Sequence, residues 1–92
     1  MIDHPKPRWA LLFDNAAVRA IHKVPSQDRK RILDALDRLA ERFPEGADTK
    51  KLKGSTGRWR LRVGDWRAIF RPIKAERVIR VLAVDRRDQA YS

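Results

Sequence analysis

The sequence contains no cysteine, which excludes disulfide bonds and thiolate metal sites. It also contains no apolar run that approaches the roughly 20 residues of a membrane-spanning helix. Residues 1–9 carry Pro5 and Pro7 among charged neighbours and lack the apolar stretch of a signal peptide. We therefore expect a soluble, cytoplasmic protein without a membrane-spanning segment.

Motifs for metal or nucleophilic catalysis are missing as well. His4 and His22 lie far in sequence from the basic strands described below, and no pair of carboxylates accompanies those strands. No Ser-His-Asp set or glycine-rich phosphate loop can be assembled, and Gly54 and Gly57 fit an ordinary loop. We expect no metal site and no cofactor.

Positive charge, by contrast, is plentiful and unevenly distributed. The 92 residues suit one small domain, expected over residues 1–92, with a net charge of +10. Residues 1–49 contain 9 Lys and Arg against 8 Asp and Glu, whereas residues 50–92 contain 13 against 4. Nucleic acid is the expected partner of the C-terminal half, with an anionic membrane or an acidic protein as the alternatives.

Residues 58–71 have the clearest pattern in the chain, an alternation of apolar and polar side chains on both sides of Gly64-Asp65. A glycine at the first position between two such stretches is typical of a two-residue β-hairpin loop. The pairs that this loop places on one face are Trp59–Phe70, Leu61–Ala68 and Val63–Trp66. The other face then carries Arg58, Arg60, Arg62, Arg67 and Arg71, interrupted by Ile69.

In this arrangement Arg62 lies opposite Arg67, and Arg58 lies opposite Arg71. Like charges in register across two strands are destabilising, by about 0.2–1 kcal/mol per pair. A solvent-exposed sheet face needs polar residues, but Lys, Thr, Glu and Gln would supply them with less repulsion. Arginine also forms bidentate contacts with phosphates. We interpret this face as a polyanion-binding surface, with an ordinary solvated face as the alternative.

The remaining segments predict the order strand, two helices, three strands. The expected elements are a strand over 9–13, a helix from Asp14 or Asn15 to Lys23, a helix capped by Ser26 with the apolar stripe Ile32, Leu36, Leu39 and Phe43, a basic loop over 50–54, the hairpin, and a last strand over 78–84. The last strand is almost continuously apolar, which is typical of a central strand covered on both faces.

This order brings the end of the last strand back to the hairpin turn. The last strand runs antiparallel to the strand that begins at Trp66, so residues 85–88 should emerge near Gly64-Asp65. Arg62, Arg67 and Arg87 would then converge, with Tyr91 over the same corner. Guanidinium groups stabilise the extra negative charge of a pentacoordinate phosphate. Metal-free cleavage of RNA by its own 2′-hydroxyl is compatible with this set, and DNA lacks that nucleophile.

The sequence resembles the RelE/ParE superfamily of type II toxin–antitoxin toxins, and the RelE-type branch in particular. The resemblance is carried by Lys23-Val24-Pro25, Arg31-Ile32-Leu33, Leu52-Lys53-Gly54, residues 57–67, and Arg86-Arg87 to Tyr91. It implies an α+β fold in which two N-terminal helices pack on a four-stranded, mostly antiparallel sheet, in the order β-α-α-β-β-β. It also implies cleavage of messenger RNA in the ribosomal A site, which leaves a 2′,3′-cyclic phosphate and a 5′-hydroxyl end.

Carried over by position, the resemblance implies the catalytic residues Arg60, Arg62, Arg67, Arg87 and Tyr91. The basic residues expected to bind RNA around them are Lys51, Lys53, Arg58, Arg71 and Arg86. Some members have lysines, which can act as general bases, where this chain has Arg60 and Arg62, and a guanidinium stays protonated. Tyr91 or an arginine-assisted route then handles the 2′-hydroxyl proton, or the protein is a weak nuclease.

Two other functions fit the same residues. The ParE branch shares the fold and poisons DNA gyrase, and a basic nucleic-acid-binding domain needs no activity at all. Either kind of toxin implies a small, net-acidic antitoxin with a partly disordered segment that folds on binding. The ribosome and mRNA are the further expected partners, and the toxin–antitoxin complex is expected to bind its own operator DNA as a higher oligomer.

Overall fold

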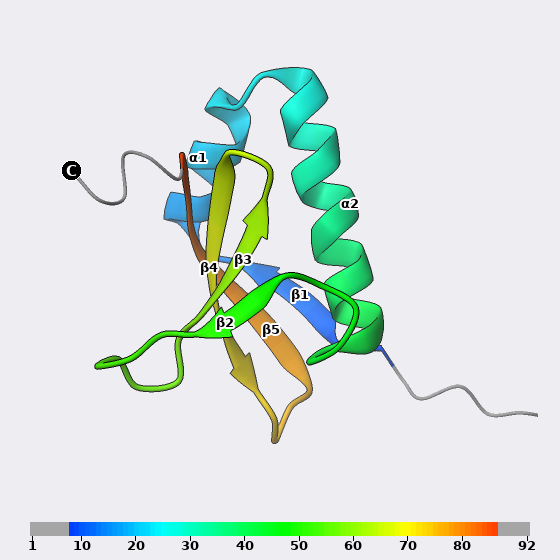
Figure 1. Cartoon of the computed structure of the whole chain (residues 1–92), viewed down its shortest axis with the longest axis vertical. Coiled ribbons are helices and arrows are strands. Elements are labelled where there is room, and N and C mark those ends of the chain that lie inside the picture. The colour runs from blue at the N-terminus through cyan, green and yellow to red at the C-terminus, as the bar shows by residue number, and fades with distance from the viewer. Residues whose placement is uncertain (1–7, 87–92) are drawn as a thin grey trace, which may run out of the picture.

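In a computed structural model, which describes residues 8–86, two helices pack on one face of a five-stranded sheet (Figure 1). The elements are β1 (Ala10–Phe13), α1 (Asn15–Lys23), α2 (Ser26–Arg42), β2 (Thr49–Lys51), β3 (Trp59–Val63), β4 (Trp66–Ile73) and β5 (Val78–Arg86). The strand order is β1-β5-β4-β3-β2, with β1 parallel to β5 and the other neighbours antiparallel. The predicted α+β class and the mostly antiparallel sheet are confirmed.

The predicted strand number is wrong by one, because part of the expected basic loop forms the edge strand β2. This strand is three residues long and contains no apolar side chain, so no alternation reveals it. It pairs with β3, with Thr49 opposite Leu61 and Lys50 opposite Arg60. A short, lysine-bearing strand is a common way to protect a sheet edge from pairing with other chains.

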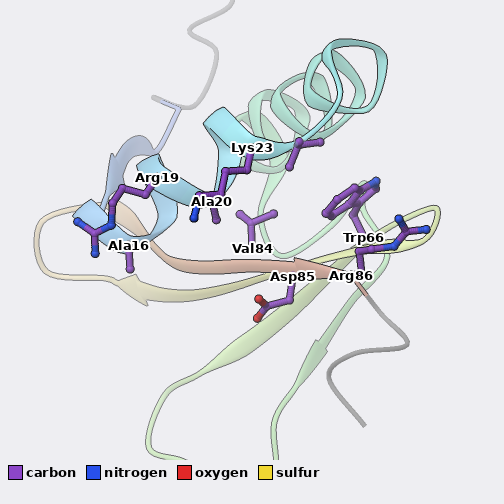
Figure 2. Close-up of a pocket in the computed structure, with 9 residues that line it drawn as sticks. Ala16, Arg19, Ala20, Lys23, Trp66, Val84, Asp85 and Arg86 are labelled. Atoms are coloured by element: carbon purple, nitrogen blue, oxygen red, sulfur yellow. The ribbon is translucent and has the colours of Figure 1, made fainter. Parts of the chain in front are cut away.

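Strand β5 is central, as predicted, but it is covered on one face only. A β-bulge interrupts its pairing with β4: Ile69 pairs with Ala83 and Phe70 with Val81, which leaves Leu82 as the extra residue. The extra residue changes which positions of the strand face the helices: Ile79 and Val81 are buried before the bulge, and Val84 is buried after it. Figure 2 shows Val84 directed toward α1 and Asp85 directed away from the helices. Leu12, 55% exposed, also marks the uncovered side of the sheet.

Both helices begin close to the predicted positions, and Asp14, one of the two predicted caps of α1, is its N-cap residue. Asp14 precedes α1, yet its carboxylate makes no capping hydrogen bond and instead accepts one from Arg80 Nε at 2.6 Å. Ser26, predicted as the cap of α2, is the first helical residue, and Pro25 is the cap. The reason is that the Pro25 carbonyl already accepts the hydrogen of Arg29 N, at 2.8 Å.

The core lies between the helices and the inner side of the sheet. Its fully buried large side chains are Ile32, Leu36, Leu39, Leu61, Phe70, Ile79 and Val81. Phe43 follows the end of α2, and its ring packs edge-on against Trp9, Trp59 and Phe70 with centroid distances of 5.0–5.6 Å. Because these apolar side chains face the helices, the alternating arginines of β3 and β4 must face the other way. Over residues 8–86, no helix is both long and apolar enough to cross a bilayer.

Candidate nucleic-acid interface

The β3–β4 hairpin has the predicted register. Gly64 adopts a φ of 58°, and the two-residue loop brings Val63 opposite Trp66 and Arg62 opposite Arg67. The indole Nε1–H of Trp66 donates to Asp28 Oδ2 at 3.0 Å. This bond ties the turn end of the hairpin to the first turn of α2, so the turn end is fixed in position.

The outer face of this hairpin has like charges in register at two places. Arg62 lies opposite Arg67, and Arg60 lies opposite Lys50 on the neighbouring strand β2. The predicted pairing of Arg58 with Arg71 is not part of the ladder, because β3 begins at Trp59. The Arg58 carbonyl instead accepts the hydrogen of Leu52 N at 2.9 Å.

These charges surround a pocket of about 350 Å³ on the outer face of the β2–β3–β4 ribbon. Its lining residues are Lys50, Lys51, Leu52, Lys53, Arg60, Arg62 and Arg67. We call this set the cationic pocket. Six of its seven lining residues are basic and none is acidic, so the pocket is suited to an anion.

Arg60 gives a second indication of an anion. Its Nη1 is buried, and within residues 8–86 no acceptor receives the hydrogens of this nitrogen. An unsatisfied buried donor costs about 1–3 kcal/mol, and more when the group is charged. A phosphate oxygen in the cationic pocket would satisfy this donor.

The cationic pocket brings together five of the ten residues proposed from the sequence. These are Lys51, Lys53, Arg60, Arg62 and Arg67. Arg58 and Arg71 are exposed and do not line this pocket, and Arg87 and Tyr91 lie outside the described residues. Lys50 also lines the pocket but was not among the predicted site residues. Its position is set by its pairing with Arg60, and the sequence did not predict the strand β2 that makes this pairing.

Arg86 lines a different cavity, of about 460 Å³, between α1 and the end of β5 (Figure 2). Its guanidinium carbon lies 5.5 Å from the centroid of the Trp66 ring, a cation–π distance. The α1 side chains around this cavity are Ala16, Arg19, Ala20 and Lys23. The cavity therefore combines apolar lining residues with three basic ones, Arg19, Lys23 and Arg86, and one acidic one, Asp85.

One further cation on the outer face is already neutralised. The Asp14 carboxylate raises the pKa of the Arg80 guanidinium above its ordinary value, first through the hydrogen bond and then through charge attraction. Arg80 lies opposite Arg71 in the sheet, at the end far from the cationic pocket. Arg80 is therefore held by a carboxylate at a distance from the cationic pocket and is not one of its lining residues.

Residues 8–91 match the protein family described as the ParE toxin of the type II toxin–antitoxin system parDE. The chain belongs to this ParE toxin family. The predicted resemblance to the RelE/ParE superfamily is thereby confirmed, and the protein is a toxin of a type II toxin–antitoxin system. No curated protein sequence matches this toxin significantly.

Solved structures of RelE toxins share the fold of this ParE-family toxin. The RelB–RelE complex of Methanococcus jannaschii matches with 27% identity and a TM-score of 0.73, over 87% of this chain and 94% of that chain. The RelE–RelB complex of Pyrococcus horikoshii OT3 matches with 28% identity and a TM-score of 0.73, over 88% and 97%. The isolated RelE toxin of E. coli, at 22% identity and a TM-score of 0.73 over 85% and 83%, supports the fold alone.

Proposed function

We propose that this toxin is a metal-independent endoribonuclease that cleaves ribosome-bound mRNA. The observation that carries the proposal is the cationic pocket, with the buried, unsatisfied Nη1 of Arg60 beside Arg62 and Arg67. A phosphodiester fits such a site because its oxygens accept hydrogen bonds from guanidinium groups in a bidentate manner.

The proposed reaction uses the substrate's own nucleophile. The 2′-hydroxyl oxygen attacks the adjacent phosphorus and loses its proton, and the bond from phosphorus to the 5′ oxygen breaks as that oxygen gains a proton. The products are a 2′,3′-cyclic phosphate and a 5′-hydroxyl end. Negative charge on the phosphoryl oxygens increases in the transition state, and Arg62 and Arg67 stabilise that charge. Arg87 and Tyr91 are proposed to complete the site.

A second candidate function is inhibition of DNA gyrase, which the resemblance to the ParE branch implies. The observation that favours it is the match of residues 8–91 to the parDE toxin family. Gyrase inhibition needs protein–protein contacts and no nuclease site. A third candidate, a basic domain that binds nucleic acid without activity, predicts salt-sensitive RNA binding only.

One induction experiment distinguishes the three functions. Cells that begin to express the toxin receive labelled amino acid and labelled thymidine, and the uptake of each label is followed. For an mRNA-cleaving toxin, amino-acid incorporation falls first and thymidine incorporation continues. A gyrase inhibitor gives the opposite order together with an SOS response. Unchanged growth and unchanged uptake of both labels would indicate an inactive binding domain.

We also propose that the antitoxin of this toxin is a small acidic protein whose binding segment folds on the toxin. The solved RelE relatives from M. jannaschii and P. horikoshii are complexes with RelB antitoxins. The excess positive charge of the cationic pocket favours acidic residues in the partner, and the cavity beside α1 offers apolar area next to three basic residues and one acidic residue. The ribosome, mRNA and an operator-bound oligomer are the other proposed partners.

Charge reversal at Arg62 tests the electrostatic part of this proposal. Arg62→Glu is expected to slow association with the antitoxin at low salt, and the difference from the unmodified toxin should shrink as salt is raised. Lys74→Glu is the matched control, since Lys74 is exposed in the β4–β5 turn at the opposite end of β4. Stopped-flow mixing measures both rates. Equal slowing by the two variants would mean that net charge, not the cationic pocket, steers association.

A further inference from the structure

The proposed reaction needs a group that removes the proton of the 2′-hydroxyl. The cationic pocket has six basic side chains, three of which are arginines. A guanidinium remains protonated at any pH at which a protein is folded, so the arginines can bind the phosphate but cannot act as the base. The lysines Lys50, Lys51 and Lys53 are the lining residues that can exist as neutral amines.

The register of β2 singles out one of these lysines. Thr49 lies opposite Leu61, which is buried against the helices, and Lys50 lies opposite Arg60 on the outer face. Because side chains alternate along a strand, Lys50 shares the face of Arg60. Lys51 also lines the cationic pocket, but its position in the strand is opposite Trp59, on the other face. Lys53 follows β2 in the loop, where no ladder pairing fixes its backbone. Lys50 is thus the amine that the sheet itself holds beside the arginines.

We propose that Lys50 is the general base of RNA cleavage in this toxin. This inference rests on the proposed ribonuclease function. The neutral amine of Lys50 takes the 2′-hydroxyl proton as the oxygen–phosphorus bond forms, and becomes an ammonium group. The 5′ oxygen leaves with the electron pair of its bond to phosphorus and receives a proton from solvent. Loss of the extra proton to solvent returns Lys50 to the amine.

Substitution by arginine separates the charge of Lys50 from its ability to take a proton. Lys50→Arg keeps the positive charge and the outer-face position, so binding of an RNA with a 2′-deoxy nucleotide at the cleavage site should change less than about threefold. The single-turnover cleavage rate should fall about 10²–10⁴-fold, the usual contribution of a positioned general base. The rise of the rate with pH that reports the neutral amine should disappear.

The experiment uses the full chain with ribosome-bound mRNA and compares Lys50→Arg, Lys50→Ala, Lys51→Arg and Lys53→Arg. Lys74→Arg is the control, since Lys74 lies outside the cationic pocket and is expected to leave the rate unchanged. Added ethylamine should restore part of the activity of Lys50→Ala, as an external base. Rescue of this kind would not follow from a purely structural role of Lys50.

The outcomes separate this inference from the function on which it rests. If the unmodified toxin cleaves no RNA, the ribonuclease function is wrong and the role of Lys50 falls with it. If the unmodified toxin cleaves and Lys50→Arg keeps the same rate and pH profile, Lys50 is not the base and the ribonuclease function stands. If Lys51→Arg or Lys53→Arg alone loses the pH-dependent rise, the assignment to Lys50 is overturned in favour of that lysine.

Discussion

Replacing Arg67 with alanine is expected to lower the rate of RNA cleavage about 10²–10³-fold, the cost of removing one donor to a developing negative charge. Arg67 lines the cationic pocket from β4 and stands opposite Arg62, so a phosphate between the two strands can contact both guanidinium groups. The fold should be retained, because Arg67 lies on the outer face and is not part of the buried apolar core. Single-turnover cleavage and thermal unfolding of the same preparations measure the two effects.

The control for this prediction is Arg38→Ala, an exposed arginine on α2, the helix that packs on the inner side of the sheet. Its cleavage rate should match that of the unmodified toxin. Arg67→Lys should recover only part of the activity, because an ammonium group cannot form the planar, bidentate contact of a guanidinium. An Arg67→Ala toxin that cleaves within about threefold of the normal rate would argue against a catalytic role for the outer face.

Replacing Phe70 with alanine is expected to lower the free energy of unfolding by about 3–5 kcal/mol, the range for large aromatic residues in a core. Phe70 is fully buried, and its ring lies 5.6 Å from that of Phe43 and 6.2 Å from that of Trp59. Small domains have total stabilities of only about 5–15 kcal/mol, so this single change should bring the toxin close to unfolding at room temperature. Denaturant-induced unfolding measures the loss.

Leu12→Ala is the matched control for Phe70→Ala. Leu12 is 55% exposed on the uncovered side of the sheet, so its truncation should cost less than about 0.5 kcal/mol, as surface substitutions usually do. If Phe70→Ala lowers the free energy of unfolding by less than about 1 kcal/mol, the packing of Phe70 against Phe43 and Trp59 does not stabilise the hairpin.

Arg67 and Phe70 lie on opposite faces of β4. On the outer face, like charges are in register at Lys50–Arg60, Arg62–Arg67 and Arg71–Arg80. An uncompensated pair of this kind costs on the order of 0.2–1 kcal/mol. Two carboxylates offset part of this cost, since Asp14 binds Arg80 and Asp85 lies opposite Arg67. On the inner face, Leu61, Ala68 and Phe70 are fully buried. Burial of the inner face therefore stabilises a pairing of strands that the like charges on the outer face destabilise. The proposed binding of RNA phosphates explains why these charges are present.

The sequence was sufficient to predict the hairpin, because two signals agreed there. Alternation set the faces of β3 and β4, and Gly64-Asp65 set the loop length and therefore the register of Arg62 with Arg67. The sequence could not reveal β2, since three polar residues form no periodic pattern. Without β2, Lys50 has no defined partner, and its place beside Arg60 could not be foreseen.

The β-bulge in β5 was equally hidden. An almost continuous apolar run does not tell which side chains are buried, and the extra residue Leu82 changes the alternation within the strand. The consequence for the site is that Asp85 lies on the outer face, opposite Arg67, although Val84 beside it is buried. The sequence also could not reveal that the carboxylate of Asp14, the N-cap residue of α1, binds Arg80 instead of the helix start, because the two residues are 66 positions apart.

The most direct test of the proposed function is to map mRNA ends in cells during growth arrest. Ribosome-bound mRNA is isolated shortly after induction of the unmodified toxin or of Arg67→Ala, and new 5′-hydroxyl ends are sequenced. The ribonuclease function predicts abundant new ends in phase with codons for the unmodified toxin, and very few for Arg67→Ala. Intact mRNA in cells that have stopped growing under the unmodified toxin would contradict it.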